Sequence, residues 1–406
     1  MINRLMSLNI LRGFQFKNYR YYFIGQGVSL VGTWMQRTAL SWYIYTITNS
    51  VFWLGFLGFI SQIPSFFITP FGGYFADKFP RLKILRISQS LAMLQALVLA
   101  VLVLTGTAQI WHIVILGFFL GCIEAFEAPI RHSFVVNLID DKNLVGNAIA
   151  LNSAMFNGAR LIGPAIAGYL VALLGEGFCF LINGLSYIAI LLSLFSIKNI
   201  SQDIMKSNTK IIANIKEGYI YLLAHKPILY FIINIIIFTL FGFNYVVLLP
   251  FLSRDILGGD AKTLGMLMSM IGLGALTGAI YLGSRKNAKG LSKIIVSLGH
   301  VACVAIFLVA FSRNITISAI LVLICGIGMM MQMAGANTVI QTLVDDNMRG
   351  RIMSIYSLAF LGFMPLGSLI SGYLSTLIGV TPTLSVSAFI CLISGLIMRK
   401  RLINVI

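Results

Sequence analysis

Residues 144–174 read LVGNAIALNSAMFNGARLIGPAIAGYLVALL, a stretch whose single charged residue is Arg160. A helix of about 20 apolar residues crosses the hydrocarbon core of a bilayer, so this stretch predicts a membrane span. An arginine at the centre of such a span costs about 2.5–3.5 kcal/mol on insertion scales, and it is kept where it faces water, a counter-charge or an anionic ligand. Asn152 and Asn157 precede Arg160, and Gly163-Pro164 follows it. The stretch therefore predicts a polar stripe inside the membrane.

The composition of the whole chain agrees with this prediction. Hydrophobic residues make up 58% of the 406 residues, and the mean hydropathy is +0.93. Charged residues make up 10%, whereas soluble domains carry roughly 25%. Twelve apolar runs of span length follow one another, six within residues 21–197 and six within 227–398. The chain is therefore predicted to be an all-α membrane protein, and a soluble enzyme is excluded.

The net charge of +17 is carried mainly by the connections between the apolar runs. When the loops are assigned alternately to two sides, 24 of the 29 basic residues fall on one side, and only Arg254, Lys262 and Arg313 fall on the other. Loops rich in Lys and Arg stay in the cytoplasm, so both termini are predicted to be cytoplasmic. Because the basic residues are dispersed, we expect no nucleic-acid partner. The two remaining arginines, Arg37 and Arg160, lie within predicted spans.

The residue types that carry chemistry in other protein classes lie far apart in this sequence. The five cysteines form no CxxC or CxxxC spacing, and the four histidines are widely separated. We therefore expect neither a disulfide framework nor a metal site. No stretch resembles a Walker A loop, so ATP coupling within this chain is not expected. We expect no cofactor, and an ion gradient remains as the energy source.

The two halves of the chain repeat each other. Leu138-Ile139-Asp140-Asp141 recurs as Leu343-Val344-Asp345-Asp346, at an offset of 205 residues. Gly168-Tyr169-Leu170 recurs as Gly372-Tyr373-Leu374, at an offset of 204 residues. Two six-helix halves of this kind are typical of transporters built from parallel repeats.

This repeat defines the predicted domains. Residues 1–197 form the N-terminal six-helix half, and residues 227–406 form the C-terminal six-helix half. Residues 198–226 form a cytoplasmic linker, the only long polar stretch of the chain. The later part of the linker, residues 211–224, is predicted to be an amphipathic surface helix.

One loop resembles a known family signature. Gly73-Tyr74-Phe75-Ala76-Asp77-Lys78, followed by Arg81 and Lys83, is similar to the G-x-x-x-D-[RK]-x-x-R-x-[RK] loop of the major facilitator superfamily. In that family the aspartate caps a neighbouring helix and pairs with an arginine to hold a cytoplasmic gate. Phe79-Pro80 departs from the common pattern, and the second half has lost the aspartate. The resemblance implies a gate formed by Gly73, Asp77, Lys78, Arg81, Asp346, Arg349 and Arg351.

Other stretches resemble the subgroup that contains the enterobactin exporter and related transmembrane secretion effectors. They are GTWMQR at 32–37, AFEAPIR at 125–131, NGARLIGP at 157–164 and FLIN at 180–183. The resemblance implies twelve transmembrane helices in two pseudo-symmetric six-helix halves, the major facilitator fold, with a substrate cavity near the midplane. It also implies a monomeric proton-driven antiporter of the bacterial inner membrane.

The substrate that we predict is an amphipathic, anionic small molecule such as a siderophore, exported by alternating access. A multidrug or macrolide exporter and a lysophospholipid flippase remain as alternatives. A non-transporting receptor on the same fold predicts no polar stripe within the membrane, so the stretch around Arg160 speaks against it. Export, as opposed to import, rests on the resemblance.

Five residues are predicted to line the substrate cavity: Arg160, Asn157, Asn152, Arg37 and Gln36. The alternative for Arg160 is a fixed ion pair that joins two helices. Arg37 either belongs to the same cavity or extends its long side chain toward the outer interface. Two cavity arginines favour a carboxylate-bearing substrate through bidentate hydrogen bonds. At the repeat offset, Met364 matches Arg160, so charge is expected mainly in the N-terminal half.

Two carboxylates are candidates for coupling to protons. Glu124 and Glu127 lie three residues apart near the inner end of the fourth span and share a helix face. Glu127 has Arg131 one turn further on, so a local ion pair is its alternative. Glu124 has no such neighbour and is the preferred proton carrier. Its alternative is a static pair with Arg160 or Arg37, and a pair that breaks on protonation satisfies both interpretations.

Small residues on two spans predict close helix packing or hinges. Gly163, Pro164 and Gly168 lie on the fifth span, and Gly274 and Gly278 on the eighth. Such residues let helix backbones approach each other closely in a membrane. In this fold the two spans are expected to face each other.

Overall fold

The computed structural model describes residues 9–197, 211–285, 287–402 and 405, without the side chains of residues 9–11, 70–78, 142 and 211–216. All elements assigned in these residues are helical. The chain divides into two compact units. Unit 1 holds residues 1–43 and 64–207, and unit 2 holds residues 44–63 and 208–406. The unit boundaries fall inside α2 (Lys17–Thr48) and α3 (Val51–Lys78).

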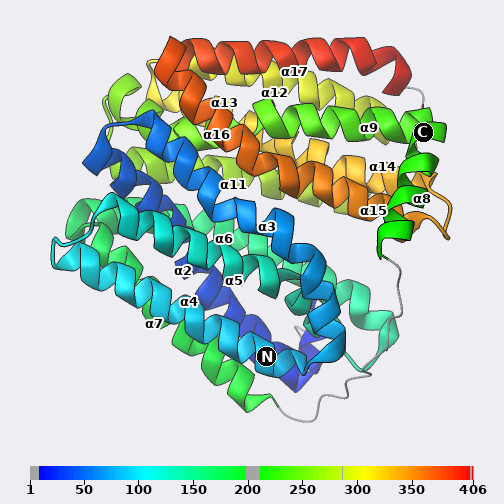
Figure 1. Ribbon diagram of the computed structural model, residues 1–406, viewed down its shortest axis with the longest axis horizontal. Coiled ribbons are helices and arrows are strands. Elements are labelled where there is room, and N and C mark those ends of the chain that lie inside the picture. Colours follow the sequence, from blue (N-terminus) through cyan, green and yellow to red (C-terminus); the bar gives the residue numbers. More distant parts are fainter. Residues whose placement is uncertain (1–8, 198–210, 286, 403–404, 406) are drawn as a thin grey trace. The chain divides into compact units, whose positions relative to one another are not determined.

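Unit 1 is built from long helices (Figure 1), which are α4 (Arg81–Leu104), α5 (Ile110–Asn137), α6 (Val145–Leu174) and α7 (Glu176–Ser196), together with parts of α2 and α3. Short 3₁₀ segments lie at Asn9–Gln15 and Lys142–Leu144. Pro129 and Pro164 lie inside α5 and α6 without ending them. The core of this unit includes the fully buried Tyr19, Tyr22 and Phe134.

Unit 2 contains more and shorter helical segments (Figure 1). Its first elements are α8 (Ile211–Ala224), α9 (Lys226–Ile237), η3 (Phe238–Gly242), η4 (Asn244–Leu248), α10 (Leu249–Phe251) and η5 (Leu252–Ile256). The next are α11 (Ala261–Ser284), α12 (Leu291–Phe311), α13 (Ile315–Met330), η6 (Met331–Gly335) and α14 (Ala336–Leu343). The last are α15 (Arg349–Ser357), η7 (Leu358–Gly362), α16 (Phe363–Ile378) and α17 (Val380–Leu402).

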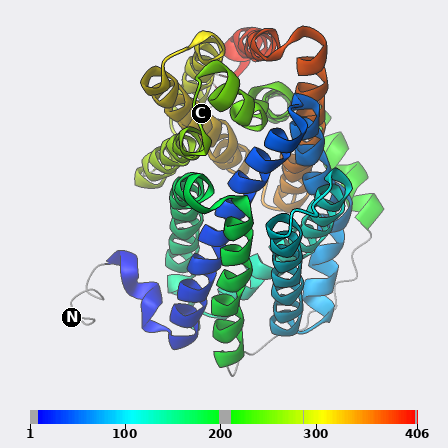
Figure 2. The ribbon, with the colours of Figure 1, turned by 90° about the vertical axis from the view of Figure 1, so that its left-hand side faces the viewer.

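The internal repeat of the sequence is also visible in the structure. In unit 1, α4 packs against α5 and α7, and in unit 2, α12 packs in the same way against α13 and α17 (Figure 2). Gly175 and Gly379, 204 residues apart, end α6 and α16 with the same φ of 87°. This left-handed region strongly favours glycine at helix ends.

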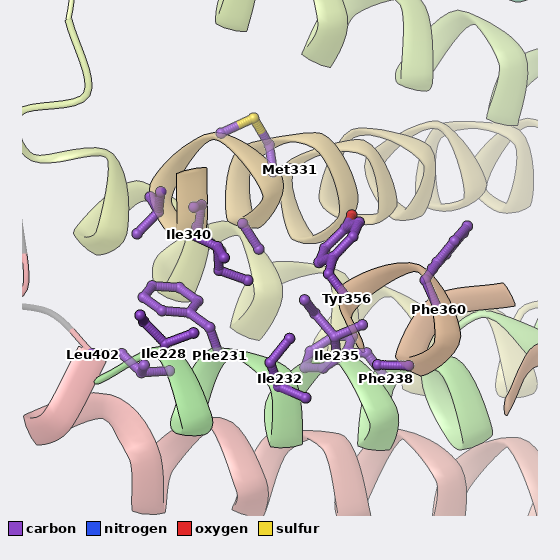
Figure 3. Close-up of a cluster of buried hydrophobic side chains, with 14 of the residues drawn as sticks. Ile228, Phe231, Ile232, Ile235, Phe238, Met331, Ile340, Tyr356, Phe360 and Leu402 are labelled. Carbon is purple, nitrogen blue, oxygen red and sulfur yellow. The ribbon is translucent and has the colours of Figure 1, made fainter. Parts of the chain in front are cut away.

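The core of unit 2 joins several helices of the unit. Figure 3 shows Ile228, Phe231, Ile232 and Ile235 of α9 packed among residues of the later helices, including Ile340, Tyr356 and Leu402. Burying an aliphatic or aromatic side chain of this size contributes about 1.5–3 kcal/mol. This cluster therefore ties the segment after the linker to the last helices of the chain.

Four π-helical turns interrupt the helices of unit 2 in the described residues: η3, η5, η6 and η7. A π turn shifts the backbone pairing by one residue, and the freed polar groups need other partners in a membrane. Asn244 supplies one, because its Nδ2 donates to the carbonyl oxygens of Thr239 and Leu240, each at 2.8 Å. The Ser368 hydroxyl donates to Asn244 Oδ1 at 3.2 Å. The seventh predicted span is thus a broken helix anchored to α16.

Specific contacts explain why residues 44–63 are grouped with unit 2, although the sequence assigned them to the N-terminal half. The Tyr45 hydroxyl donates to Asp255 Oδ2 at 2.7 Å, and Arg254 Nη1 donates to Asn49 Oδ1 at 2.8 Å. Gly55 packs directly on α16, where a Cβ at this position would lie 2.6 Å from the Cα of Gly372. The end of α2 and the start of α3 are therefore held on η5 and α16.

Eleven helical segments of the described chain are long and apolar enough to cross a membrane. Each of the twelve predicted spans coincides with one of these segments or with α2. Although α2 has 32 residues, its polar residues, including Gln26, Gln36 and Arg37, lower its mean hydropathy. The first predicted linker residues, 198–210, lie outside the described residues.

Candidate functional site

Trp34 of α2 lies beside two guanidinium groups in unit 1. Arg37 Cζ is 5.3 Å from the centroid of the Trp34 ring, and Arg160 Cζ of α6 is 5.5 Å from it. Phe156 of α6 meets the indole edge-on, with ring centroids 5.7 Å apart and an interplanar angle of 76°. Cations within about 6 Å of an aromatic centroid are attracted by the ring. Together with Glu124, these four residues are called the arginine–tryptophan cluster below.

Helical spacing and a glycine bring the cluster together. Trp34 and Arg37 are three residues apart on α2, and Phe156 and Arg160 are four apart on α6, so each pair shares a face. A Cβ at Gly163 would lie 2.6 Å from the Trp34 Cβ and 2.8 Å from the Val31 carbonyl oxygen. Since no side chain larger than hydrogen fits there, Gly163 sets the close approach of α6 to α2.

Glu124 of α5 completes the cluster through an ion pair. Its Oε2 lies 2.5 Å from Arg37 Nη2. The side chains of Arg37 and Glu124 keep 46% and 35% of their surface exposed. One of the two pairings that the sequence left open for Glu124 is therefore formed. Arg160 lies on α6, the third helix of the cluster, and is half-buried.

Gln36 lies apart from the predicted cavity residues, although it directly precedes Arg37. It is 1% exposed, and its Nε2 donates to Gln95 Oε1 at 3.1 Å. Its Oε1 accepts from Asn183 Nδ2 at 2.7 Å. Consecutive residues of a helix point to different sides, so Gln36 joins α2 to α4 and α7 inside the unit. In this structure Gln36 is thus buried among helices of unit 1, and its place in a cavity stays a prediction.

The other polar residues of the predicted stripe and of the fourth span make local contacts. Asn157 is 7% exposed and donates to the Ser153 carbonyl oxygen on its own helix at 2.9 Å. Asn152 is half-buried. Glu127 is buried, accepts from Gln89 Nε2 at 2.8 Å, and lies 3.4 Å from Arg131 Nη1. Its oxygens are thus engaged by two donors within unit 1.

The predicted gate residues are only partly described. The side chains of Asp77 and Lys78 and the surroundings of Gly73 lie outside what the structure describes. Arg81 donates to Asn137 Oδ1 at 2.8 Å, which joins the start of α4 to the end of α5.

The two predicted gate arginines of the second half have different carboxylate partners. Arg349 pairs with Asp346 at 2.5 Å, and Arg351 pairs with Glu217 of the linker helix α8 at 2.9 Å. The sequence did not suggest this partner, because Glu217 is distant from Arg351 in the chain and the linker was considered only as a surface helix.

The packing glycines of the two spans have different partners. Gly163 packs on α2, and Pro164 and Gly168 are buried in α6. The space beside Gly274 is filled by the backbone of α13 at Leu323 and Gly326, and that beside Gly278 by Met330. Gly274 and Gly278 therefore allow α11 to pack closely on α13. Gly326 makes this possible because it faces the backbone of α11 in turn.

The cluster presents charged groups beside apolar rings, and this combination suits an amphipathic anion. With its groups ionised, it carries two positive charges and one negative charge. Arginine presents a planar fork that binds carboxylates in a bidentate manner. The indole of Trp34 and the ring of Phe156 offer apolar and polarisable faces beside that charge. Trp34 was not singled out in the sequence, although its spacing to Arg37 was a usable signal.

Known proteins resemble this chain in sequence and in fold. The model of a family described as transmembrane secretion effector matches residues 10–405. The staphyloferrin A transporter of Staphylococcus aureus is 27% identical over 373 residues, which cover 90% of this chain and 92% of that protein. A bacterial homologue of the human lysosomal transporter Spinster superposes with a TM-score of 0.73 and 13% identity, covering 95% of this chain and 98% of that one. A POT family transporter superposes with a TM-score of 0.77 and 14% identity, with coverage of 94% and 95%.

Proposed function

The chain belongs to the transmembrane secretion effector family of major facilitator transporters, and from this premise we propose that it exports an amphipathic, anionic small molecule such as a siderophore. It is an integral membrane protein and a secondary transporter. The similarity to a staphyloferrin A transporter over nine-tenths of both chains supports a substrate of this kind. The proposed location is the bacterial inner membrane, with both termini in the cytoplasm.

The arginine–tryptophan cluster is the observation that carries this proposal. Arg37 and Arg160 approach one indole, in two helices that the sequence predicts to span the membrane. Charged side chains inside a span face water or a partner rather than lipid, and the exposure of Arg37 and Glu124 is consistent with an aqueous side. The excess positive charge favours an anion, and the two aromatic rings favour an apolar or aromatic group on the same molecule.

The Arg37–Glu124 pair supports a specific form of proton coupling. While Glu124 is ionised it occupies the guanidinium of Arg37, and a proton on Glu124 would release that guanidinium to a substrate anion. The proton and the anion therefore favour each other's binding, by the reciprocity of linked equilibria. The family resemblance implied exchange of substrate for protons. The Arg37–Glu124 pair instead supports release of the proton and the substrate anion on the same side of the membrane.

The membrane potential makes such co-release compatible with export. Moving one elementary charge across 100 mV corresponds to about 2.3 kcal/mol. An anion with two or more negative charges that leaves with one proton still carries net negative charge out of the cell. An interior-negative potential drives that movement, so an inward proton flux is not required.

Transport in proteoliposomes tests the proposal. The panel contains carboxylate, catecholate and hydroxamate siderophores, with a neutral macrolide and a lysophospholipid as comparisons. We expect movement of the anionic compounds only, dependent on the membrane potential and lost in Arg160→Ala. Equal movement of the neutral macrolide would contradict the anion proposal. A pH-sensitive dye in the lumen reports whether protons move with the substrate or against it, and movement against it would restore the exchange mechanism.

A further inference from the structure

The C-terminal end of α2 is held on the seventh predicted span by side-chain contacts. The Tyr45 hydroxyl donates to Asp255 Oδ2 at 2.7 Å. Just after the helix, Asn49 Oδ1 accepts from Arg254 Nη1 at 2.8 Å. Tyr45 is 3% exposed, because the guanidinium of Arg254 and the ring of Phe251 lie beside it, with their centres 5.7 and 6.2 Å from its ring centroid. These five residues are called the tyrosine latch below.

The start of α3 packs on α16 through a pair of glycines. A Cβ at Gly55 would lie 2.6 Å from the Gly372 Cα, and a Cβ at Gly372 would lie 2.7 Å from the Gly55 Cα. Nearly one turn further along α3, a Cβ at Gly58 would lie 3.0 Å from the Ser368 Cβ. Small residues let two helix backbones meet inside a membrane. A larger side chain at either glycine of the pair would therefore separate α3 from α16.

These contacts join parts of the chain that the sequence repeat assigns to different halves. Residues 44–63 belong to the first two predicted spans, in the N-terminal half of the repeat, whereas their contacts group them with unit 2. The distribution of basic residues predicts that Arg254 lies on the side opposite to the cytoplasm, which is called the outer side here. In a transporter built from two halves, contacts between the halves at one end close that end, and they separate when it opens.

The construction of α2 connects the latch to the arginine–tryptophan cluster. This helix of 32 residues is continuous, although it passes from unit 1 to unit 2 between Tyr43 and Ile44. Residues 33–48 contain neither proline nor glycine, so this part of α2 lacks the usual causes of a kink. Arg37 precedes Tyr45 by eight residues, which corresponds to about 12 Å along the helix axis. A displacement of Arg37 along or across the axis is therefore transmitted to Tyr45.

The helix α3 differs from α2 at its own unit boundary. Pro64 lies inside α3, at the point where the chain returns to unit 1. A proline inside a helix removes one backbone hydrogen bond and permits a bend. A movement between the halves can therefore bend α3 at Pro64, whereas in α2 it has to pull Tyr45 and Asn49 away from their partners.

We propose that the tyrosine latch and the Gly55–Gly372 contact form the outer gate of this transporter, and that they separate whenever the arginine–tryptophan cluster opens to the outer side. The structure corresponds to the state in which this gate is closed. The proposal rests on the alternating access of the proposed function. It does not depend on the identity or the charge of the substrate.

Labelling of a cysteine in the cluster from one side of the membrane tests the gate without any substrate. The full-length protein, with the half-buried Cys122 replaced by Ser and the four buried cysteines kept, carries Phe156→Cys, a position that is 38% exposed beside Trp34. A membrane-impermeant maleimide is added to either side of oriented proteoliposomes. Gly55→Leu forces the glycine pair apart. Gly283→Leu is its matched control in unit 2, because no atom lies within 4 Å of a Cβ at that position.

We expect Gly55→Leu to speed up labelling from the outer side by about tenfold, because the rate follows the fraction of molecules that are open. Labelling from the inner side should slow down, since one end closes as the other opens. Tyr45→Phe, which removes a single hydrogen bond, should give a smaller effect in the same direction, and Gly283→Leu should give none. Unchanged outer labelling in both Gly55→Leu and Tyr45→Phe would overturn the outer gate. Equally faster labelling from both sides would also overturn it, because the variant would then only loosen the helices.

A cross-link tests the gate in the closed direction. Gly58→Cys with Ser368→Cys places two thiols on facing positions of α3 and α16, where the Cβ separation of 3.0 Å is close to the about 3.5–4.5 Å that a disulfide spans. Oxidation should lower outer labelling of Phe156→Cys, and reduction should restore it. Equal outer labelling before and after complete cross-linking would overturn the gate. A failure to transport anions would change none of these results, so the gate and the substrate proposal can fail separately.

Discussion

Arg37 and Glu124 form an ion pair, with 2.5 Å between Nη2 and Oε2, in which both side chains keep part of their surface exposed. Because neither side chain is fully enclosed by unit 1, a substrate anion can reach the guanidinium and take the place of the carboxylate. Glu127 is less suited to an exchange of partners, because it is buried and contacts both Gln89 and Arg131.

Replacing Glu124 by Gln should make substrate binding independent of pH. In the wild type, ionised Glu124 competes with the substrate anion for Arg37, so we expect affinity to weaken as the pH rises. Glutamine is neutral at every pH and should hold the affinity at its low-pH value. The measurement is substrate Kd against pH in detergent or nanodiscs. Glu127→Gln is the matched control and should keep the wild-type pH dependence; the wild-type pH dependence in Glu124→Gln would remove Glu124 from coupling.

Replacing Arg160 by Ala should weaken anion binding. A hydrogen-bonded contact to a charged group contributes about 1.5–3 kcal/mol, so we expect roughly a 10- to 100-fold rise in Kd. Arg160→Lys keeps the charge but loses the planar fork, and its loss should be smaller. Both variants are tested with the same anionic substrate and with a neutral analogue. Unchanged anion binding in Arg160→Ala would mean that Arg160 only joins helices.

Replacing Gly163 by Ala should destabilise the protein. The new methyl group would lie 2.6 Å from the Trp34 Cβ, and such overpacking costs about 1–3 kcal/mol. Gly158→Ala on the same helix is the matched control, because no atom lies within 4 Å of its Cβ position. Alanine should raise helix stability there by up to about 1 kcal/mol. Thermal unfolding in detergent measures both, and equal melting temperatures would contradict the close packing of α6 on α2.

Replacing Asn183 by Leu should destabilise unit 1. The change leaves the buried Gln36 Oε1 without the Asn183 donor, and an unsatisfied buried polar group costs about 1–3 kcal/mol. The double variant Gln36→Leu with Asn183→Leu removes both ends of this contact and should recover part of the loss. Thermal unfolding of the two single variants and the double variant gives the coupling free energy between the two side chains. Strict additivity would show that the two amides act independently.

Replacing Tyr45 by Phe should loosen the end of α2 from η5. It removes the hydrogen bond to Asp255, and a hydrogen bond to a charged group contributes about 1.5–3 kcal/mol. Asp255→Asn retains an acceptor oxygen and should be milder. The readout is hydrogen exchange of the backbone amides of residues 44–49, which should become faster in Tyr45→Phe. Unchanged exchange there would show that Gly55 and α16 hold this segment without the tyrosine.

The order and length of the helices follow from the sequence because span length and charge distribution are strong signals. Each predicted span was found as a helix, and the repeat between Gly175 and Gly379 extends to their backbone angles. The π turns of unit 2 were not predictable, since a shift of one residue in backbone pairing leaves the hydrophobic pattern almost unchanged. The grouping of residues 44–63 with unit 2 also depends on distant contacts such as Tyr45 with Asp255.

The charged residues of the candidate site could be identified from the sequence, whereas most of their contacts could not. Arg37, Arg160 and Glu124 were found because ionised groups within apolar runs are rare. The partners of Gln36 were not predicted, because neighbouring residues of a helix point in different directions and the sequence alone does not show which side faces the bundle. The contact between Glu217 and Arg351 crosses 134 residues of chain, and local spacing carries no information about it.

The position of Trp34 gives this protein an optical reporter of its own. Indole emission responds to nearby charge, and Trp34 has two guanidinium groups within 5.5 Å of its ring centroid. Only three other tryptophans occur in the chain, Trp42, Trp53 and Trp111, and each can be replaced by Phe. The emission of the remaining indole would then follow occupancy of the cluster in real time, without a label and before the substrate is known.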